Sequence, residues 1–201
     1  MRRHTTGLRE NFIRDDDSTF HTFYWDVGTG EPLRGGTAQG AADNSCWARG
    51  QAWGIYGFAL NYRGTQDPKL LDASQRCADY FLAHLPQDSV PYWDLIFSDG
   101  SGAERDSSSG AIAVCGLLEL AELIEDDEAV ARYRSEAEKI MSSLIKNYTP
   151  SSPEASDALI LQGVYDMPHR NGVDEGNLWG DYFYLEALAR YILGDKWRPY
   201  W

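Results

Sequence analysis

Predicted helices recur along this sequence in pairs, with a short turn inside each pair and a long loop between pairs. Apolar residues at three-and-four spacing predict helices over residues 44–63, 67–85, 107–124, 128–148 and 178–193, and residues 1–14 fit the end of a further helix. Loops that contain Gly and Pro separate the pairs over residues 15–43, 86–106 and 149–177. Helix starts repeat after roughly 60–70 residues, which is typical of a repeated αα-hairpin.

The helices that follow long loops differ in composition from their partners. Residues 44–63 and 107–124 are rich in Ala and Gly, whereas residues 128–148 carry many Glu, Arg and Lys side chains. Small residues on all sides let a helix approach several neighbours closely, so we expect the first kind to form an inner layer and the second an outer one. An inner and an outer ring of helices make an α/α toroid. The predicted fold is therefore all-α and of the (α/α)6 toroid or barrel type.

The length of the chain limits how much of such a ring it can form. Six hairpins of about 60 residues each would need roughly 360 residues, and this chain has 201. We therefore expect residues 1–201 to form a single domain, with its helices arranged as αα-hairpins, that covers about half of a toroid.

Composition disfavours several functional classes. With 18 basic and 31 acidic side chains the formal charge is −13, which opposes binding to nucleic acid or to an anionic membrane. The longest nearly uncharged apolar run, residues 110–118, is too short for a membrane span, which needs about 20 residues, and we expect no secretory signal. Three cysteines without CxxC spacing predict reduced thiols in a cytoplasmic protein. The sequence predicts neither a bound metal nor a cofactor.

The most informative segment is residues 37–53. Arg49 and Trp53 are four positions apart, so they share one face near the start of a predicted helix. An Arg fork beside an indole suits a carboxylate attached to a sugar ring. Upstream, His21 and Gln39 offer hydrogen-bonding groups from the same loop. The alternative interpretation is that Trp53 is a core residue, Arg49 pairs with an acid and His21 lies on the surface.

Other residues of the long loops are weaker candidates. Arg34, Arg105 and Arg170 could make a locally basic mouth with His21 and Arg49, or they could each bridge loops. Asp106 is expected to cap the helix that begins at residue 107. Asp181 could point into the cavity, although a helix cap or a structural ion pair is the expected role. Asp94 lies in a loop, where it either lines the mouth or serves loop packing.

Four segments together resemble a known family. They are Trp47-Ala-Arg-Gly-Gln-Ala-Trp53, Arg105-Asp-Ser-Ser108, Trp179-Gly-Asp-Tyr-Phe-Tyr-Leu-Glu-Ala187 and Lys196-Trp-Arg-Pro-Tyr-Trp201. They resemble glycoside hydrolase family 88, the unsaturated glucuronyl hydrolases, in the C-terminal portion of that family. The resemblance implies an (α/α)6 barrel that acts on oligosaccharides ending in a 4,5-unsaturated glucuronate, the ends that polysaccharide lyases leave. It also implies hydration of the vinyl-ether double bond, after which a hemiketal opens and releases the next sugar.

The resemblance also assigns residues. By their positions in the matching motifs, His21, Gln39, Arg49 and Trp53 correspond to residues that contact the substrate. The family's two principal aspartates, one of them the acid/base, correspond to a segment upstream of this chain. General acid–base catalysis contributes roughly 10²–10⁴-fold, so we expect the chain alone to be nearly inactive.

Two other functions remain open. The related unsaturated rhamnogalacturonyl hydrolases share the toroid and a similar Trp-Ala-Arg-Gly motif, although Gln51 and Ala52 before Trp53 favour the glucuronyl group. The chain could instead be a non-catalytic half-toroid that binds a uronate-containing sugar. A half-ring would expose apolar walls, so we expect either a homo-oligomer or a missing N-terminal half as a partner.

Overall fold

The computed structural model describes residues 2–198, with side chains from residue 4 onward, and shows a layered helical fold. Its α-helices are α1 (Arg2–Phe12), α2 (Ala48–Thr65), α3 (Pro68–Ala83), α4 (Ser107–Ala121), α5 (Asp127–Ser143) and α6 (Leu178–Leu193). A π-helical turn, Leu144–Tyr148, extends α5, and a 3-10 turn, Gly194–Lys196, follows α6. Every helix in this part of the chain is too short or too polar to cross a lipid bilayer.

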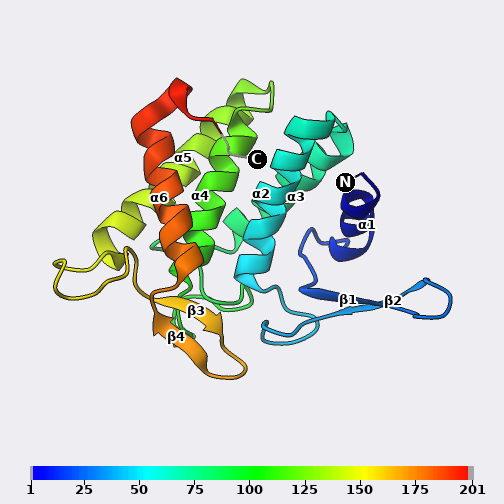
Figure 1. Ribbon diagram of the computed structural model, residues 1–201, viewed down its shortest axis with the longest axis horizontal. Coiled ribbons are helices and arrows are strands. Elements are labelled where there is room, and N and C mark those ends of the chain that lie inside the picture. Colours follow the sequence, from blue (N-terminus) through cyan, green and yellow to red (C-terminus); the bar gives the residue numbers. More distant parts are fainter. Residues whose placement is uncertain (1, 199–201) are drawn as a thin grey trace.

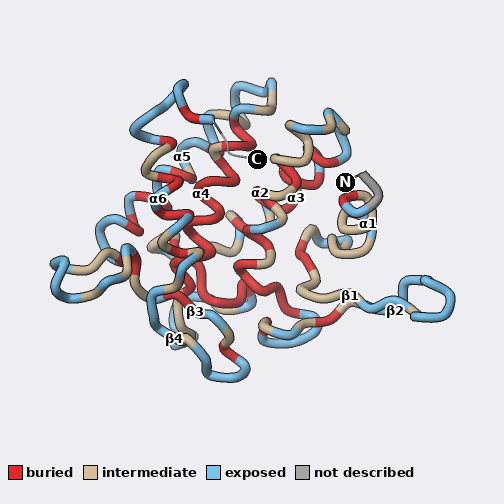
Figure 2. The backbone as a smooth tube through the Cα atoms, viewed as in Figure 1, coloured by how far each residue is buried: buried red, intermediate tan, exposed pale blue. Residues whose placement is uncertain are grey.

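The helices that follow long loops form the inner layer, as the composition predicted. Helix α4 packs between α2 and α6, whereas α3 packs on α2 and α5 packs on α4 (Figure 1). Helix α1 contacts both α2 and α3 at the edge of the assembly. All residues of α4 except Leu118 are buried, so this helix is the centre of the core (Figure 2).

Close approach of α2 and α4 depends on Gly116. A Cβ atom at this position would lie 2.9 Å from Ile55 Cγ2 and 3.0 Å from the backbone nitrogen of Tyr56. Any side chain would therefore push the two inner helices apart. This is the physical reason for the small residues that the sequence places on these helices.

A buried ionic cluster holds the three inner helices in register. The Arg190 guanidinium of α6 lies 3.0 Å from both Glu119 of α4 and Glu186 of α6, and it donates a hydrogen bond to the Tyr56 hydroxyl of α2. Glu119 also accepts from Arg63 of α2. Burial raises the pKa of Tyr56, so its hydroxyl stays protonated and donates to Glu186. Each buried charge thereby meets an opposite charge, which the low dielectric of the core requires.

Two short hairpins occupy the long loops, and the all-α prediction missed them. Strands β1 (Thr22–Trp25) and β2 (Pro32–Gly36) pair antiparallel, as do β3 (Gly163–Asp166) and β4 (Asn171–Glu175). These strands have only four or five residues each, and all but β1 contain glycine, so they lack the long apolar alternation that identifies a strand in a sequence. The hairpins precede α2 and α6, so both lie at the end of the molecule where the inner helices begin (Figure 1).

The predicted helix limits are confirmed at some ends and shifted at others. Helix α6 has the predicted limits, and Gly194 after it has a positive φ of 50°. The Asp67 side chain caps α3 by accepting from the backbone nitrogen of Lys69. Helix α2 begins at Ala48 instead of residue 44, because the Cys46 carbonyl accepts from the Leu95 backbone nitrogen and the Ala48 backbone nitrogen donates to the Trp93 carbonyl.

We predict opposite effects of alanine at two glycines of the inner helices. Gly116→Ala should lower the free energy of unfolding by about 1–3 kcal/mol, because its new methyl group overlaps α2. Gly64→Ala, where no atom lies within 4 Å of the new Cβ, should be neutral or should stabilise the chain by at most about 1 kcal/mol. Urea unfolding followed by circular dichroism measures both changes, and equal effects of the two substitutions would contradict the close approach described here.

Candidate functional site

The His21 imidazole organises the loop before α2. Its Nδ1 atom accepts hydrogen bonds from the backbone nitrogens of Ala38 and Gln39, at 3.1 and 3.0 Å. Its ring centroid lies 4.3 Å from that of Trp47. Burial, followed by the nearby Arg49 charge, lowers the pKa of His21, so the ring is neutral at neutral pH. Because Nδ1 is an acceptor, the proton of the neutral ring is assigned to Nε2, which is then a donor available to a ligand.

The Asp94 side chain holds the same loop by hydrogen bonds. This side chain is fully buried, and its two carboxylate oxygens accept from the backbone nitrogens of Ala41, Cys46 and Ile96 and from the Ser45 hydroxyl. The loop between His21 and α2 therefore has a fixed shape before any ligand arrives. Of the two alternatives that the sequence left open for Asp94, the structure therefore shows loop packing.

Arg49 is a buried clamp between α2, α4 and the β3–β4 hairpin. Its Nη1 atom donates to Asp106 Oδ2 at 3.0 Å, to Ser108 Oγ at 3.2 Å and to the Val164 carbonyl. Its Nη2 atom donates to the Tyr165 carbonyl at 2.8 Å. Only 3% of the Arg49 side chain is exposed. The ion pair of the alternative interpretation is therefore present, and direct contact of Arg49 with a ligand stays a prediction.

Gln39, in the loop before α2, contacts the same part of β3 as Arg49. Its Nε2 atom donates to the Tyr165 carbonyl at 3.1 Å, the same oxygen that accepts from Arg49. His21, Gln39 and Arg49 are thus linked through the Gln39 backbone and one carbonyl of β3. Three of the four residues that the sequence singled out lie together at one end of the inner helices.

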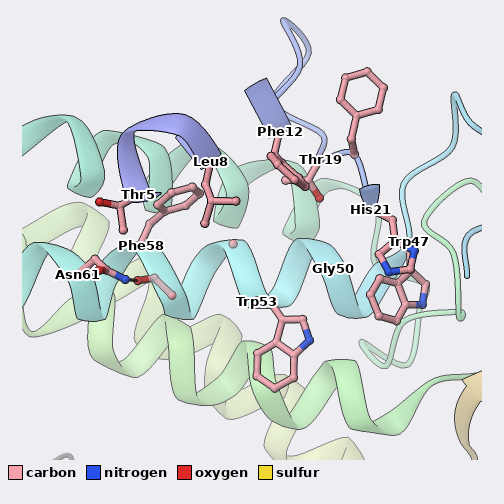
Figure 3. Close-up of a pocket in the computed structure, with 13 residues that line it drawn as sticks. Thr5, Leu8, Phe12, Thr19, His21, Trp47, Gly50, Trp53, Phe58 and Asn61 are labelled. Atoms are coloured by element: carbon pink, nitrogen blue, oxygen red, sulfur yellow. Dashed lines mark hydrogen bonds between the residues drawn. The ribbon is translucent and has the colours of Figure 1, made fainter. Parts of the chain in front are cut away.

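Trp53 lines the cavity next to these residues. This cavity of about 370 Å³ lies between α1 and α2, with His21 and Trp47 at one end and Phe58 and Asn61 at the other (Figure 3). Trp53 is 37% exposed, so it is not a core residue. Its indole packs edge-to-face on Phe183 of α6, at 5.1 Å between ring centroids.

Aromatic rings from the β3–β4 hairpin and α6 lie close to Arg49. The ring centroids of Tyr165 and Trp179 are 5.3 Å apart, and the Arg49 guanidinium lies 5.3 Å from the Trp179 ring. Next to Tyr165, Asp166 Oδ2 contacts His169 Nδ1 at 2.8 Å, while the buried Oδ1 atom has no hydrogen-bond partner among the described residues. Sequence reasoning missed Tyr165 and Asp166, which lie in a loop with no motif that the sequence alone marks as functional.

The structure favours the alternative in which the loop arginines bridge loops, instead of the one with a locally basic mouth. Arg34, Arg105 and Arg170 each lie within 4 Å of a carboxylate, as Arg49 does; their respective partners are Asp43, Asp88 with Asp99, and Glu104. His21 adds no charge, because its pKa is lowered. A carboxylate of the loops thus pairs with each of these arginines, and charge alone would not draw an anion to this end.

Two aspartates also differ from their expected roles. The Asp106 carboxylate makes no capping hydrogen bond to α4 but accepts from Arg49, from the Ser108 hydroxyl and from the Val164 backbone nitrogen. Asp181 Oδ1 accepts from the backbone nitrogens of Leu159 and Ile160, so it fixes the loop before β3. Both carboxylates position loops of the candidate site.

The layers of helices define this chain as part of an (α/α)6 toroid, and the candidate site lies at the N-terminal ends of its inner helices. No protein-family model matches the chain. It is 48% identical over 199 residues to the unsaturated chondroitin disaccharide hydrolase of Streptococcus pyogenes serotype M1. This match covers 98% of this chain and 49% of that protein. It superposes on the crystal structure of unsaturated glucuronyl hydrolase from Streptococcus agalactiae with a TM-score of 0.90 and 49% identity, over 95% of this chain and 48% of the other.

A further crystal structure of the S. agalactiae enzyme is that of an Asp-to-Asn variant complexed with dGlcA-GalNAc6S. It matches with a TM-score of 0.85 and 49% identity, over 95% of this chain and 50% of the other. The chain is therefore homologous, along nearly all of its length, to the unsaturated glucuronyl hydrolases, glycoside hydrolase family 88, which its sequence resembles, and it spans about half the length of the relatives it matches. The closing motif of the resemblance is described only to residue 198, and residues 199–201 lie outside the described residues.

We predict that Arg49→Met destabilises the chain strongly. The change leaves the fully buried Asp106 without its cation, and loss of one partner of a buried ion pair typically costs about 3–5 kcal/mol. Arg170→Met removes an exposed arginine from its pair with Glu104 and should change stability by less than about 1 kcal/mol. Urea unfolding compares the two variants, and a small effect at Arg49 would show that the clamp is not needed for the fold.

We predict a pH dependence of stability that belongs to His21. Because its pKa is lower in the folded chain than the value of about 6.5 in an unfolded one, its contribution is complete above that pH. The contribution is lost as the pH falls through the folded pKa, where protonation of Nδ1 breaks both backbone contacts. Thermal melts between pH 7.5 and pH 5 should therefore show a steeper loss for the wild-type chain than for His21→Gln. Parallel curves would assign the acid sensitivity to other groups.

Proposed function

We propose that this chain binds oligosaccharides that end in a 4,5-unsaturated glucuronate and forms part of an unsaturated glucuronyl hydrolase. The observation that carries the proposal is the identity of 48–49%, along nearly all of the chain, to hydrolases of this specificity, one of them with an unsaturated disaccharide bound. The proposed ligands of the sugar are His21, Gln39, Arg49 and Trp53.

The geometry supports a different role for each of these residues in binding the sugar. Trp53 presents a partly exposed indole, on which the apolar face of a sugar ring can pack. His21 Nε2 is a donor toward sugar oxygens, because Nδ1 is held by the backbone. Arg49 and Gln39 converge on the Tyr165 carbonyl, so in this structure Arg49 mainly positions the β3 wall. A direct contact of its guanidinium with a carboxylate would need one of these bonds to open.

The proposed reaction is hydration of the vinyl ether of the unsaturated sugar. A proton adds to the double bond, water adds to the carbon that carries the ring oxygen, and the resulting hemiketal opens with release of the next sugar. The protonating acid corresponds, by the family resemblance, to a residue outside this chain. The chain alone should therefore bind the substrate and turn it over very slowly.

The proposed setting is the cytoplasm, downstream of enzymes that cleave polysaccharides by elimination. Cys46, Cys77 and Cys115 are buried as free thiols, which fits a reducing compartment. Burial raises the pKa of Cys46 to about 12, so this thiol is unreactive at neutral pH.

We predict that the chain alone binds an unsaturated chondroitin disaccharide without appreciable hydration. Binding is measured by the change in tryptophan fluorescence, and hydration by the loss of ultraviolet absorbance of the 4,5 double bond. Trp53→Ala should weaken binding on the order of tenfold, equivalent to about 1.4 kcal/mol. Trp25→Ala, an exposed indole on β1 outside the cavity, is the matched control and should leave binding unchanged.

The outcomes separate the two functions. Hydration by the chain joined to the complementary half of the S. agalactiae enzyme, but not by the chain alone, would support the hydrolase assignment. Binding without hydration in both proteins would instead favour a non-catalytic uronate-binding half-toroid. If both tryptophan variants bind as tightly as the wild-type chain, the ligand does not contact Trp53.

A further inference from the structure

The indole of Trp53 receives little support from its own helix. On an α-helix, the side chains three and four positions away are the nearest neighbours. For Trp53 two of these four positions are Gly50 and Gly57, the third is Arg49, whose guanidinium is turned into the buried clamp, and the fourth is Tyr56. A Cβ atom at Gly57 would have no atom within 4 Å, so within the described part of the chain no side chain from another element fills that position.

Other elements also leave the indole of Trp53 largely free. Its side chain is 37% exposed, and its nitrogen makes no hydrogen bond to any residue that the structure describes. Figure 3 shows the indole extending from α2 on the side away from Leu8 and Phe12 of α1. A tryptophan side chain turns about two bonds, so without a fixed neighbour it would populate several rotamers. The ring contact with Phe183 is the feature that remains to fix its orientation.

Phe183 of α6 meets Trp53 edge-to-face. The two ring centroids are 5.1 Å apart, and the ring planes make an angle of 72°. In this arrangement the positive edge of one ring faces the negative face of the other, which adds attraction beyond that of the buried apolar area. Because the contact is directional, it selects one orientation of the indole. An aliphatic side chain at the same position would only fill space.

The Phe183 ring is itself held in place. Its side chain is only 8% exposed, and its ring packs on Tyr182 at 4.8 Å and on Tyr56 of α2 at 6.0 Å between centroids. The Phe183 carbonyl accepts a hydrogen bond from the Cys115 thiol of α4 at 3.3 Å. Phe183 therefore offers Trp53 a neighbour that does not move with solvent.

The Tyr56 ring connects this contact to the buried ionic cluster. The Tyr56 hydroxyl donates to Glu186 and accepts from Arg190, so its ring cannot turn without breaking bonds to buried charges. The same ring packs against Phe183, at an angle of 87° between the ring planes. The orientation of Trp53 thus depends on a continuous set of contacts that begins at the ionic cluster of the three inner helices.

We propose that Phe183 is a positioning residue of the candidate site, whose ring fixes the orientation in which the Trp53 indole lines the cavity. Trp53 is one of the described residues around this cavity and Phe183 is not, so Phe183 acts through Trp53. The order of the indole follows from the ring contacts alone, whereas its effect on sugar binding rests on the proposed function. An indole that is already oriented loses less conformational entropy when a sugar ring packs on it.

The first test measures the order of the indole without any ligand. In NMR spectra of the isotope-labelled chain, the indole N–H signal of Trp53 is identified by its loss in Trp53→Ala. Its heteronuclear NOE should match the values of the α2 backbone in the wild-type chain and fall clearly below them in Phe183→Leu. An indole that is mobile in the wild-type chain, or that stays equally ordered in Phe183→Leu, overturns the proposal.

Tyr184→Leu is the matched control for this test. Tyr184 follows Phe183 on α6 and is 6% exposed, but its ring makes no contact with Trp53 among the described residues. The two leucine variants should lose similar stability in urea unfolding, and only Phe183→Leu should loosen the indole. Equal loosening in both variants would show that α6 as a whole, and not the Phe183 ring, holds Trp53, which also overturns the proposal.

The second test is a double-mutant cycle on the binding of an unsaturated chondroitin disaccharide, measured by calorimetry. Phe183→Leu should weaken binding by between about two- and tenfold, the range that one aromatic pair contributes. In the Trp53→Ala chain the same substitution should change binding no further, since the indole that Phe183 orients is gone. Equal weakening in both backgrounds, or in neither, overturns the proposal.

The two tests separate this inference from the proposed function. If no chain binds the disaccharide but Phe183→Leu alone loosens the indole, the proposed function fails and the ordering of Trp53 by Phe183 stands. If the wild-type chain binds and Trp53→Ala weakens that binding, but the indole is equally ordered with and without the Phe183 ring, the proposed function stands and the positioning role fails.

Discussion

The buried ion pair between Arg49 and Asp106 is the interaction on which the candidate site depends. Arg49 belongs to α2, Asp106 precedes α4, and both bind the backbone of β3, so one pair of charges joins two inner helices to a hairpin. Neither charge is accessible to water, so neither can lose its partner cheaply. The position of the Tyr165 carbonyl, and with it the orientation of Gln39, follows from this pair.

Pairing of carboxylates within the chain explains both the ordered loops and the absence of a basic mouth. Long loops must satisfy many backbone nitrogens away from secondary structure, and here aspartate carboxylates accept hydrogen bonds from several of them. Asp94 holds the loop before α2, and Asp181 holds the loop before β3. The acids of this acidic chain are thus partly consumed inside it, and others neutralise the arginines of the loops. Recognition at this end then rests on shape, aromatic surface and the neutral His21 instead of on net charge.

The sequence predicted the alternation of inner and outer helices because it follows from short-range patterns. Apolar spacing identifies α3, and the small residues around Gly116 predict close packing. It also brought His21, Gln39 and Arg49 forward, since they lie close together along the chain. It could not reveal that Tyr165, more than a hundred residues later, supplies the oxygen shared by Gln39 and Arg49. Contacts of this range, like the pairing of Arg170 with Glu104, depend on tertiary structure and leave no local pattern.

The two faces of helix α2 differ in how closely other parts of the chain pack against them. On one face, Ile55 and Tyr56 meet α4 so closely that Gly116 has no room for a methyl group. On the opposite face, a Cβ atom at Gly57 would have no atom within 4 Å, although small and apolar residues line both faces. Helix α6 repeats the asymmetry, with Phe183 buried on one side and Leu185 exposed on the other. The cavity beside α2 is lined without Asp, Glu, Lys or Arg among the described residues, so apolar contact, and not charge, decides what packs on that face.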